Sequence, residues 1–94
     1  MMHGNLPSVA TPRIYLYGEA VDMRKSFDGL MVIVQTELLR DVREGELFVF
    51  LNRRADRLKA LWWDGDGLAI FMKRLEAGTF QRATSKESVP GTID

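Results

Sequence analysis

The sequence predicts an α+β domain in which one amphipathic helix packs on an antiparallel sheet of four or five strands, in the order β-α-β-β-β. Three observations predict this fold. Apolar residues recur with helical spacing between positions 27 and 38. Short runs rich in β-branched and aromatic residues lie before and after that segment. The later runs are separated by the turn-forming sequences NRRAD and DGDG. A chain of 94 residues is long enough for one small domain.

The ends of the chain differ in composition from its centre. Residues 1–12 contain two prolines, a glycine and small polar residues, which predicts a flexible N-terminal arm. Residues 83–94 are polar and small, which predicts a largely unstructured tail. We therefore expect a single domain at 13–82. The one histidine, His3, lies on the arm, where it lacks the fixed geometry that catalysis or metal binding needs.

The first two elements are a strand and the helix. The strand is RIYLY at 13–17, followed by Gly18. Ser26 precedes the helical run and can cap it, with Asp22 as an earlier alternative. Gly45 is the expected terminator of a helix that ends near 40–44. The expected buried face of this helix comprises Phe27, Leu30, Met31, Val34 and Leu38.

The stretch from Leu47 to Arg74 carries the rest of the sheet. Strands are expected at 46–51, 57–63 and 68–74, with a short helix as the alternative for the last and a possible fifth strand at 80–82. If the DGDG turn closes symmetrically, the facing pairs are Trp63 with Leu68, Leu61 with Ile70, Lys59 with Met72, and Arg57 with Arg74.

Both faces of this predicted hairpin are substantially apolar. One face carries Leu61, Trp63, Leu68 and Ile70, and the other carries Leu58, Ala60, Trp62, Ala69 and Phe71. One helix can cover only one of them. The other face must be covered by the termini, by a second copy of the chain or by a partner, because large exposed apolar patches usually mark interaction surfaces.

The bulk composition excludes several classes of protein. The formal net charge is zero, which argues against a strongly basic nucleic-acid binder. The absence of cysteine excludes disulfides and thiolate metal sites. No apolar run approaches the ~18 residues of a membrane span, and the first residues lack the pattern of a signal peptide. We therefore expect a cytoplasmic protein.

Two charged motifs offer chemistry. Asp64 and Asp66 could hold a catalytic metal, as in metal-dependent nucleases, but Asp-Gly pairs between strands are first of all turn residues. Arg53, Arg54 and Arg57 form a basic turn that suits phosphate or carboxylate contact, or is simply a solvated loop. No nucleophile, phosphate loop or cofactor motif is present, so we expect neither enzymatic activity nor a cofactor.

Two blocks of sequence resemble a known family. The first is DMRKSFDGL at 22–30. The second runs through LFVF at 47–50, NRRADRLK at 52–59, WDGDGL at 63–68 and KRLEAGTF at 73–80. Together they are similar to the TnpB accessory proteins, the second open reading frame of the insertion sequence 66 family of bacterial transposons. The resemblance covers residues 13–80, and beyond it the sequence lacks the Trp-Pro-like step and apolar helical segment that family members usually have.

The resemblance implies a non-enzymatic accessory protein of DNA transposition that assists a separate transposase. The implied partners are the transposase of the same element and transposon-end DNA. The uncovered apolar sheet face, read from the residues alone, also allows a homo-oligomer. The alternatives are a protein-interaction module without DNA contact and, less favoured, a metal-dependent nuclease. The basic residues expected to contact nucleic acid or an acidic partner are Arg24, Lys25, Arg53, Arg54, Arg57, Lys59, Lys73 and Arg74.

Overall fold

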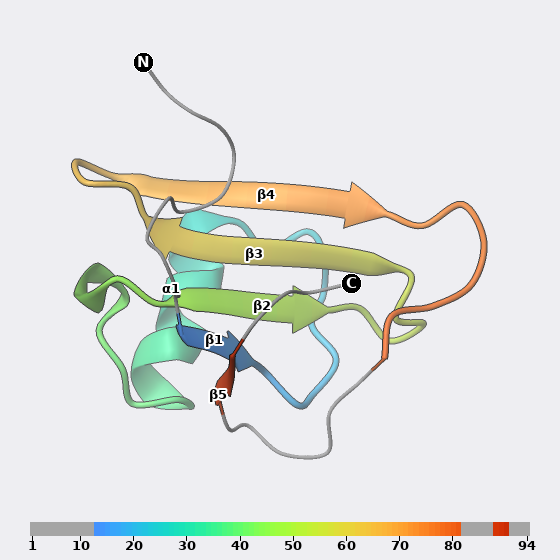
Figure 1. The fold of residues 1–94 in the computed structure, drawn as a ribbon, viewed down its shortest axis with the longest axis horizontal. Coiled ribbons are helices and arrows are strands. Elements are labelled where there is room, and N and C mark those ends of the chain that lie inside the picture. Colours follow the sequence, from blue (N-terminus) through green and yellow to red (C-terminus); the bar gives the residue numbers. More distant parts are fainter. Residues whose placement is uncertain (1–12, 82–87, 91–94) are drawn as a thin grey trace.

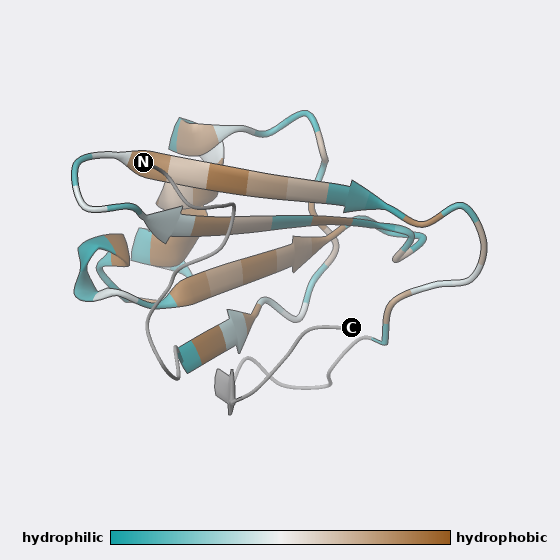
Figure 2. Cartoon of the chain, turned by 45° about the horizontal axis from the view of Figure 1, so that its top comes forward, coloured by the Kyte–Doolittle hydropathy of each residue, from teal (hydrophilic) through white to brown (hydrophobic). Residues whose placement is uncertain are grey.

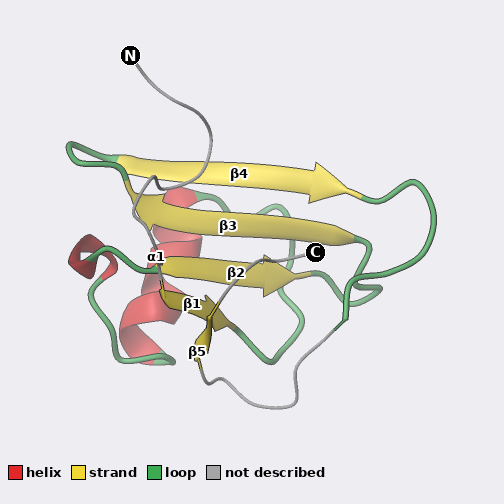
Figure 3. Ribbon diagram, viewed as in Figure 1, coloured by secondary structure: helices red, strands yellow, loops and turns green. Residues whose placement is uncertain are grey.

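The structure is a computed structural model that describes residues 13–81 and 88–90. Helix α1 packs across one face of a single five-stranded sheet (Figures 1 and 3), which confirms the α+β class. No helix within the described ranges is both long and apolar enough to cross a membrane. In chain order the elements are β1 (Arg13–Leu16), α1 (Phe27–Thr36), the 3-10 helix η1 (Val42–Glu44), β2 (Leu47–Leu51), β3 (Arg57–Trp63), β4 (Leu68–Arg74) and β5 (Ser88–Pro90).

The sheet is mixed, and the expectation of a purely antiparallel sheet is wrong. The strand order is β4-β3-β2-β1-β5, and β1 pairs with β2 in parallel, with Ile14 opposite Leu47. Parallel neighbours require a long crossover connection. The segment between β1 and β2, which contains α1 and η1, supplies that connection.

The β3–β4 hairpin has the predicted register. All four predicted pairs are present: Trp63 with Leu68, Leu61 with Ile70, Lys59 with Met72, and Arg57 with Arg74. Strand β4 pairs with β3 along all seven of its residues. The pattern of turn residues and alternating side chains was therefore sufficient to define this hairpin.

Helix α1 begins where expected but ends early. Ser26 is the N-cap residue, although its side chain makes no capping hydrogen bond. The helix stops at Thr36 rather than near 40–44, and Leu39 follows in the left-handed region with φ of 55°. Gly45 ends η1 instead, with φ of 94°. On the predicted buried face, Leu30 and Val34 are fully buried, whereas Phe27 is exposed.

Two apolar clusters lie on the two faces of the sheet. The cluster under α1 includes Leu30, Phe48 and Leu61, and the Tyr15 ring stacks on Phe48 at 5.4 Å between centroids. The cluster on the other face includes Val49 and Trp62. It also contains Ala60 and Phe80, with Leu75 packed against it. Trp62 is only 4% exposed, so the centre of this second face is covered, as the sequence required, whereas Ala69 and Phe71 are only partly buried.

The region after β4 differs from expectation. Phe80 and Gln81 are not in a strand, so the fifth strand suggested at 80–82 is wrong where the structure describes it. The fifth strand is instead β5, which pairs antiparallel with β1, with Ile14 opposite Val89. It falls within the segment expected to be an unstructured tail. The N-terminal arm at 1–12, with His3, lies outside the described residues, as does the remainder of that tail.

Candidate nucleic-acid interface

The β2–β3 turn is held in shape by Asn52. Its side-chain oxygen accepts hydrogen bonds from the backbone N–H groups of Asp56 at 3.0 Å and Arg57 at 2.9 Å. Its amide nitrogen donates to the Asp56 carboxylate at 2.7 Å. Ala55 completes the turn in the left-handed region with φ of 57°. Because the turn is closed by its own polar groups, the side chains of Arg53 and Arg54 project into solvent.

The loop between β1 and α1 lies beside this turn and carries an Asp-x-Arg pair. The Asp22 carboxylate accepts the backbone N–H of Arg24 at 2.9 Å and its guanidinium at 2.7 Å. A backbone hydrogen bond from Val21 to Leu51, at 2.9 Å, joins the loop to the end of β2. The loop is therefore positioned against the same end of the sheet as the β2–β3 turn.

Lys59, on β3, holds the loop between β1 and α1 in place. Its ammonium donates to the backbone oxygens of Met23 at 2.8 Å and Lys25 at 2.7 Å, and the residue is only 9% exposed. The side chain thus spans from β3 to the loop through a largely buried path. Lys59 acts on the site by positioning the loop, with its charge already engaged by two carbonyl groups.

The loop, the turn and the C-terminal end of β4 together form an open groove of about 670 Å³. Its floor is partly apolar, with Val21 and Met72 among its members, and Met72 is 49% exposed. Four arginines line this groove: Arg24, Arg53, Arg54 and Arg57. We call this feature the arginine groove.

The arginine groove brings together half of the eight predicted basic residues. Of the other four, Lys59 is buried beneath the loop, and Lys25 is exposed beside it. Arg74 stands opposite Arg57 in the sheet but forms an exposed ion pair with Glu76 at 3.0 Å. Lys73 is displaced by one residue from Arg74, so its side chain is directed to the opposite face of the sheet.

Two carboxyl groups beside the arginine groove, those of Asp22 and Asp56, have lowered pKa values. Hydrogen bonds from the side chain and backbone of Arg24 lower the pKa of Asp22 from 3.8 to about 2. The pKa of Asp56 is also lowered, first by the hydrogen bond from Asn52 and further by the charges of Arg54 and Arg57. Both carboxylates therefore remain ionised at neutral pH, and each reduces the charge of the groove by one.

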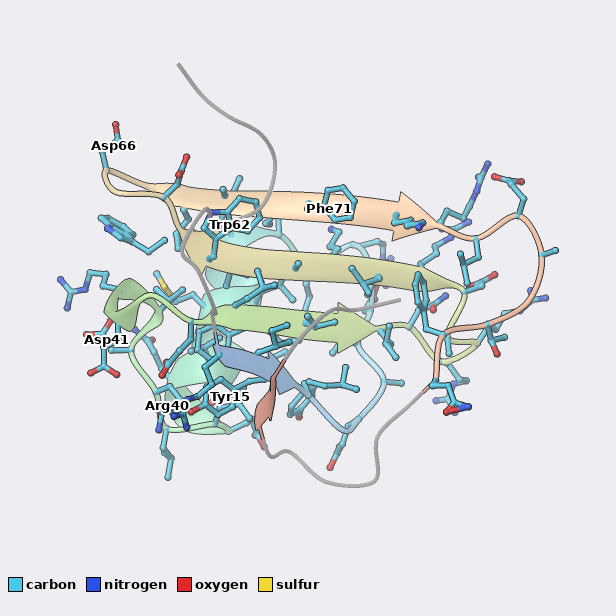
Figure 4. The ribbon with its side chains drawn as sticks, viewed as in Figure 1. Tyr15, Arg40, Asp41, Trp62, Asp66 and Phe71 are labelled. Carbon is cyan, nitrogen blue, oxygen red and sulfur yellow. The ribbon has the colours of Figure 1, made fainter. Side chains whose placement is uncertain are left out.

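Arg53, Arg54 and Arg57 form no ion pair within the part of the chain that the structure describes. In contrast, the guanidinium groups of Arg40 and Arg43, at the other end of the sheet, form ion pairs with carboxylates. Arg40 pairs with Glu46 at 2.7 Å and lies 4.7 Å from the centre of the Tyr15 ring (Figure 4). The groove is thus the place where unpaired cationic side chains gather.

The acidic pair Asp64 and Asp66 forms a turn. The Asp64 N–H donates to the Gly67 carbonyl at 2.7 Å, and the Asp66 N–H donates to the Asp64 carbonyl at 2.9 Å. Gly65 has φ of 82°, which favours glycine at that position. Among the residues in 13–81 and 88–90, no three His, Cys, Asp or Glu side chains come together as a metal site.

Sequence reasoning missed three contributors to the groove: Asn52, Asp22 and Met72. The Asp-x-Arg pattern was a usable signal for Asp22, because the same pattern recurs at Asp41 and Arg43 with the same hydrogen bonds. The predicted pairing placed Met72 on the same face as Arg57, but no local signal brings the loop before α1 against that face to form the groove.

The described residues thus form a small α+β domain with a cationic groove at one end of its sheet. Comparison with known proteins identifies its family. The model of the family described as IS66 Orf2-like protein matches residues 12–93, and the chain belongs to this family. The resemblance seen in residues 13–80 is confirmed, and the match extends beyond Phe80.

Two curated relatives come from Sinorhizobium fredii. The chain is 41% identical over 68 residues to the uncharacterized protein y4jC, covering 72% of this chain and 58% of that protein. It is 40% identical over 75 residues to the uncharacterized protein y4hO, covering 80% of this chain and 65% of that one. The chain therefore spans roughly three fifths of the length of these relatives. No solved structure matches it significantly.

Proposed function

We propose that this chain is a non-enzymatic accessory protein of IS66 transposition that contacts the phosphate backbone of DNA through the arginine groove. The observation that carries the proposal is the gathering of Arg53, Arg54 and Arg57, exposed and without ion pairs in the described residues, beside Arg24. The proposed partners are transposon-end DNA and the transposase of the same element, in keeping with the family.

The charge arrangement supports an anionic ligand. Arg57 and Arg74 face each other across β3 and β4, and like charges in directly opposite positions destabilise a sheet. Three arginines within five residues of the turn add to this repulsion. An anion bound in the groove reduces this repulsion at Arg57 and the turn, whereas Arg74 is already paired with Glu76. A guanidinium can donate two parallel hydrogen bonds to a phosphate. Contacts of this kind hold DNA without reading its sequence.

A protein ligand is the second candidate. The floor of the groove contains Ala20, Val21 and the exposed Met72, and apolar surface of this kind suits a peptide better than a sugar-phosphate chain. An acidic segment of the transposase with apolar residues between its carboxylates would fit. The two ligands differ in how their binding responds to salt.

The deciding experiment is DNA binding by fluorescence anisotropy across a series of salt concentrations, with a mixed-sequence duplex. If four arginines each neutralise one phosphate, the logarithm of the binding constant should fall with the logarithm of salt with a slope of about −3.6. Between about 50 and 200 mM salt the affinity should fall on the order of 10²-fold. Absent or salt-independent binding would contradict DNA contact and favour the peptide.

A pair of variants locates the contact. Arg54→Ala should make the slope shallower by about 0.9, because one phosphate contact is lost. Arg43→Ala removes the same charge from η1, away from the groove, and should leave the slope unchanged. Equal effects of both variants would show that only overall charge matters.

A second pair tests the role of Asp22. Asp22→Asn keeps an oxygen that can accept the Arg24 N–H but removes a negative charge from the groove, so DNA should bind more tightly. Asp41→Asn makes the same change in the matching Asp-x-Arg pair and should have no such effect. Weaker binding by Asp22→Asn would place the DNA elsewhere.

A further inference from the structure

Strand β4 forms one edge of the sheet in the part of the chain that the structure describes. The strand is seven residues long, lies at the end of the order β4-β3-β2-β1-β5, and contains no proline or glycine. The opposite edge is β5, only three residues long and ending in Pro90. Natural sheets usually protect their edges by such short strands and prolines. The only protective feature within β4 is the pair of charged residues Lys73 and Arg74 at its hydrophilic C-terminal end (Figure 2).

The hydrogen bonds at the two ends of the hairpin show which backbone groups of β4 point outward. The Asp64 N–H donates to the Gly67 carbonyl, and the Leu75 N–H donates to the Asp56 carbonyl at 2.8 Å. Hydrogen-bonded and non-bonded pairs alternate along an antiparallel ladder. Counting from either end, Ala69, Phe71 and Lys73 bond to β3. The residues with outward backbone groups are therefore Leu68, Ile70, Met72 and Arg74.

We propose that this chain forms a two-fold symmetric dimer in which β4 pairs antiparallel with β4 of a second copy, centred on Phe71. In this register Leu68 lies opposite the partner copy's Arg74, and Ile70 lies opposite its Met72. All four outward residues then become hydrogen-bonded, and the two sheets merge into one. Registers shifted by two residues leave part of the strand unpaired.

The charges along β4 favour this antiparallel arrangement. One end adjoins Asp64 and Asp66, and the other carries Lys73 and Arg74, with Arg57 beside them and Glu76 following. Antiparallel pairing brings the acidic end of each copy toward the basic end of the other. Parallel pairing would place like charges together, which is unfavourable. Within the strand, both cations would face the uncharged Leu68 and Ala69.

The self-association belongs to the edge and not to the apolar face away from α1, because that face is buried within the chain. Side chains at the edge contribute as well. Phe71 is half-buried, and its ring would meet the same ring of the second copy in a cross-strand aromatic pair, a favourable arrangement in sheets. The proposal does not depend on what the arginine groove binds.

Sedimentation velocity over a range of concentrations tests the dimer. The chain should approach twice its 10.7 kDa monomer mass as concentration rises. Met72→Pro removes an outward N–H without breaking a bond to β3, so the variant should fold and remain monomeric. Met72→Ala keeps the N–H and should still dimerise. A wild-type chain that stays monomeric at every concentration, or a Met72→Pro variant that is folded and dimeric, would overturn the proposal.

A cysteine placed on the symmetry axis tests the register, since the chain has no cysteine of its own. In the proposed register, residue 71 of one copy lies directly opposite residue 71 of the second copy. The two form a non-hydrogen-bonded pair, in which the Cα atoms are about 4.5 Å apart and a disulfide can form. Phe71→Cys should give a disulfide-linked dimer on mild oxidation. Lys73→Cys, which would face Ala69, should not. Linkage by Lys73→Cys and not by Phe71→Cys would contradict this register.

Discussion

Asp22 and Arg24 form an exposed pair whose effect depends on pH in a defined direction. The pKa of Asp22 is about 2 in the folded protein, below its ordinary 3.8, because Arg24 donates hydrogen bonds to the ionised form. A carboxyl group with a lower pKa in the folded state stabilises that state above its unfolded pKa. The contribution of this pair is therefore present above 3.8 and is lost as the pH falls through about 2.

An NMR titration of the carboxyl carbons measures this effect directly. Arg24→Ala should raise the pKa of Asp22 toward 3.8, because the three side-chain hydrogen bonds and the nearby charge are removed. The pKa of Asp41, lowered by its own hydrogen bonds from Arg43, should not change in this variant. If the pKa of Asp22 stayed near 2 without the guanidinium, its backbone hydrogen bond alone would have to account for the shift.

At the scale of the element, the end of α1 contains a backbone strain that a substitution can relieve. Leu39 has φ of 55° and is 79% exposed, so its side chain contributes little packing. Leu39→Gly should raise the free energy of unfolding by about 0.5–1 kcal/mol, because glycine avoids the left-handed penalty but has a more flexible unfolded chain. Chemical denaturation gives the value. Leu38→Gly, at a half-buried position with negative φ, should be destabilising.

The hydrogen bonds from Lys59 on β3 to the loop before α1 allow a second test at this scale. Lys59→Met removes the ammonium that donates to the carbonyls of Met23 and Lys25. The free energy of unfolding should fall by about 1.5–3 kcal/mol, and backbone NMR signals of the loop should shift. Lys73→Met makes the same change on an exposed side chain and should stay within about 0.5 kcal/mol of the wild type. Equal stability of the two variants would refute the positioning role of Lys59.

The hairpin and the helix start were predictable because local signals determine them. The DGDG turn and the alternation of side chains define the β3–β4 register without reference to the rest of the chain. The end of α1 was misplaced because Leu38 continues the apolar spacing, although the helix stops at Thr36. The direction of β1 was missed because nothing in its sequence distinguishes parallel from antiparallel pairing, and the crossover through α1 decides it.

The candidate site was predictable only in part, because some of its residues are placed by the local sequence and others by long-range packing. The exposed arginines of the β2–β3 turn follow from the turn sequence itself. The buried position of Lys59 depends on contacts with residues 34 and 36 positions away in the chain, which no local pattern encodes. The joining of Arg24 to the other arginines depends on the same long-range packing of the loop.

At the scale of the whole molecule, the β4 edge and the arginine groove are related through Met72, which belongs to both. A two-fold axis perpendicular to the sheet leaves each face of the sheet on its own side. Arg57, Met72 and the loop holding Arg24 lie on the α1 side. A dimer through β4 would therefore present two arginine grooves on one face.

This geometry predicts that DNA binding depends on duplex length as well as on salt. A duplex long enough to reach both grooves should bind the disulfide-linked Phe71→Cys dimer more tightly than a duplex that fills one groove, by on the order of 10²-fold. The gain arises because the second contact becomes intramolecular. Anisotropy titrations with short and long duplexes measure it, and the same Phe71→Cys variant, kept reduced and diluted until it is monomeric, serves as the control without a second groove. Equal affinities of the linked dimer for both lengths would mean that the two grooves do not act on one DNA.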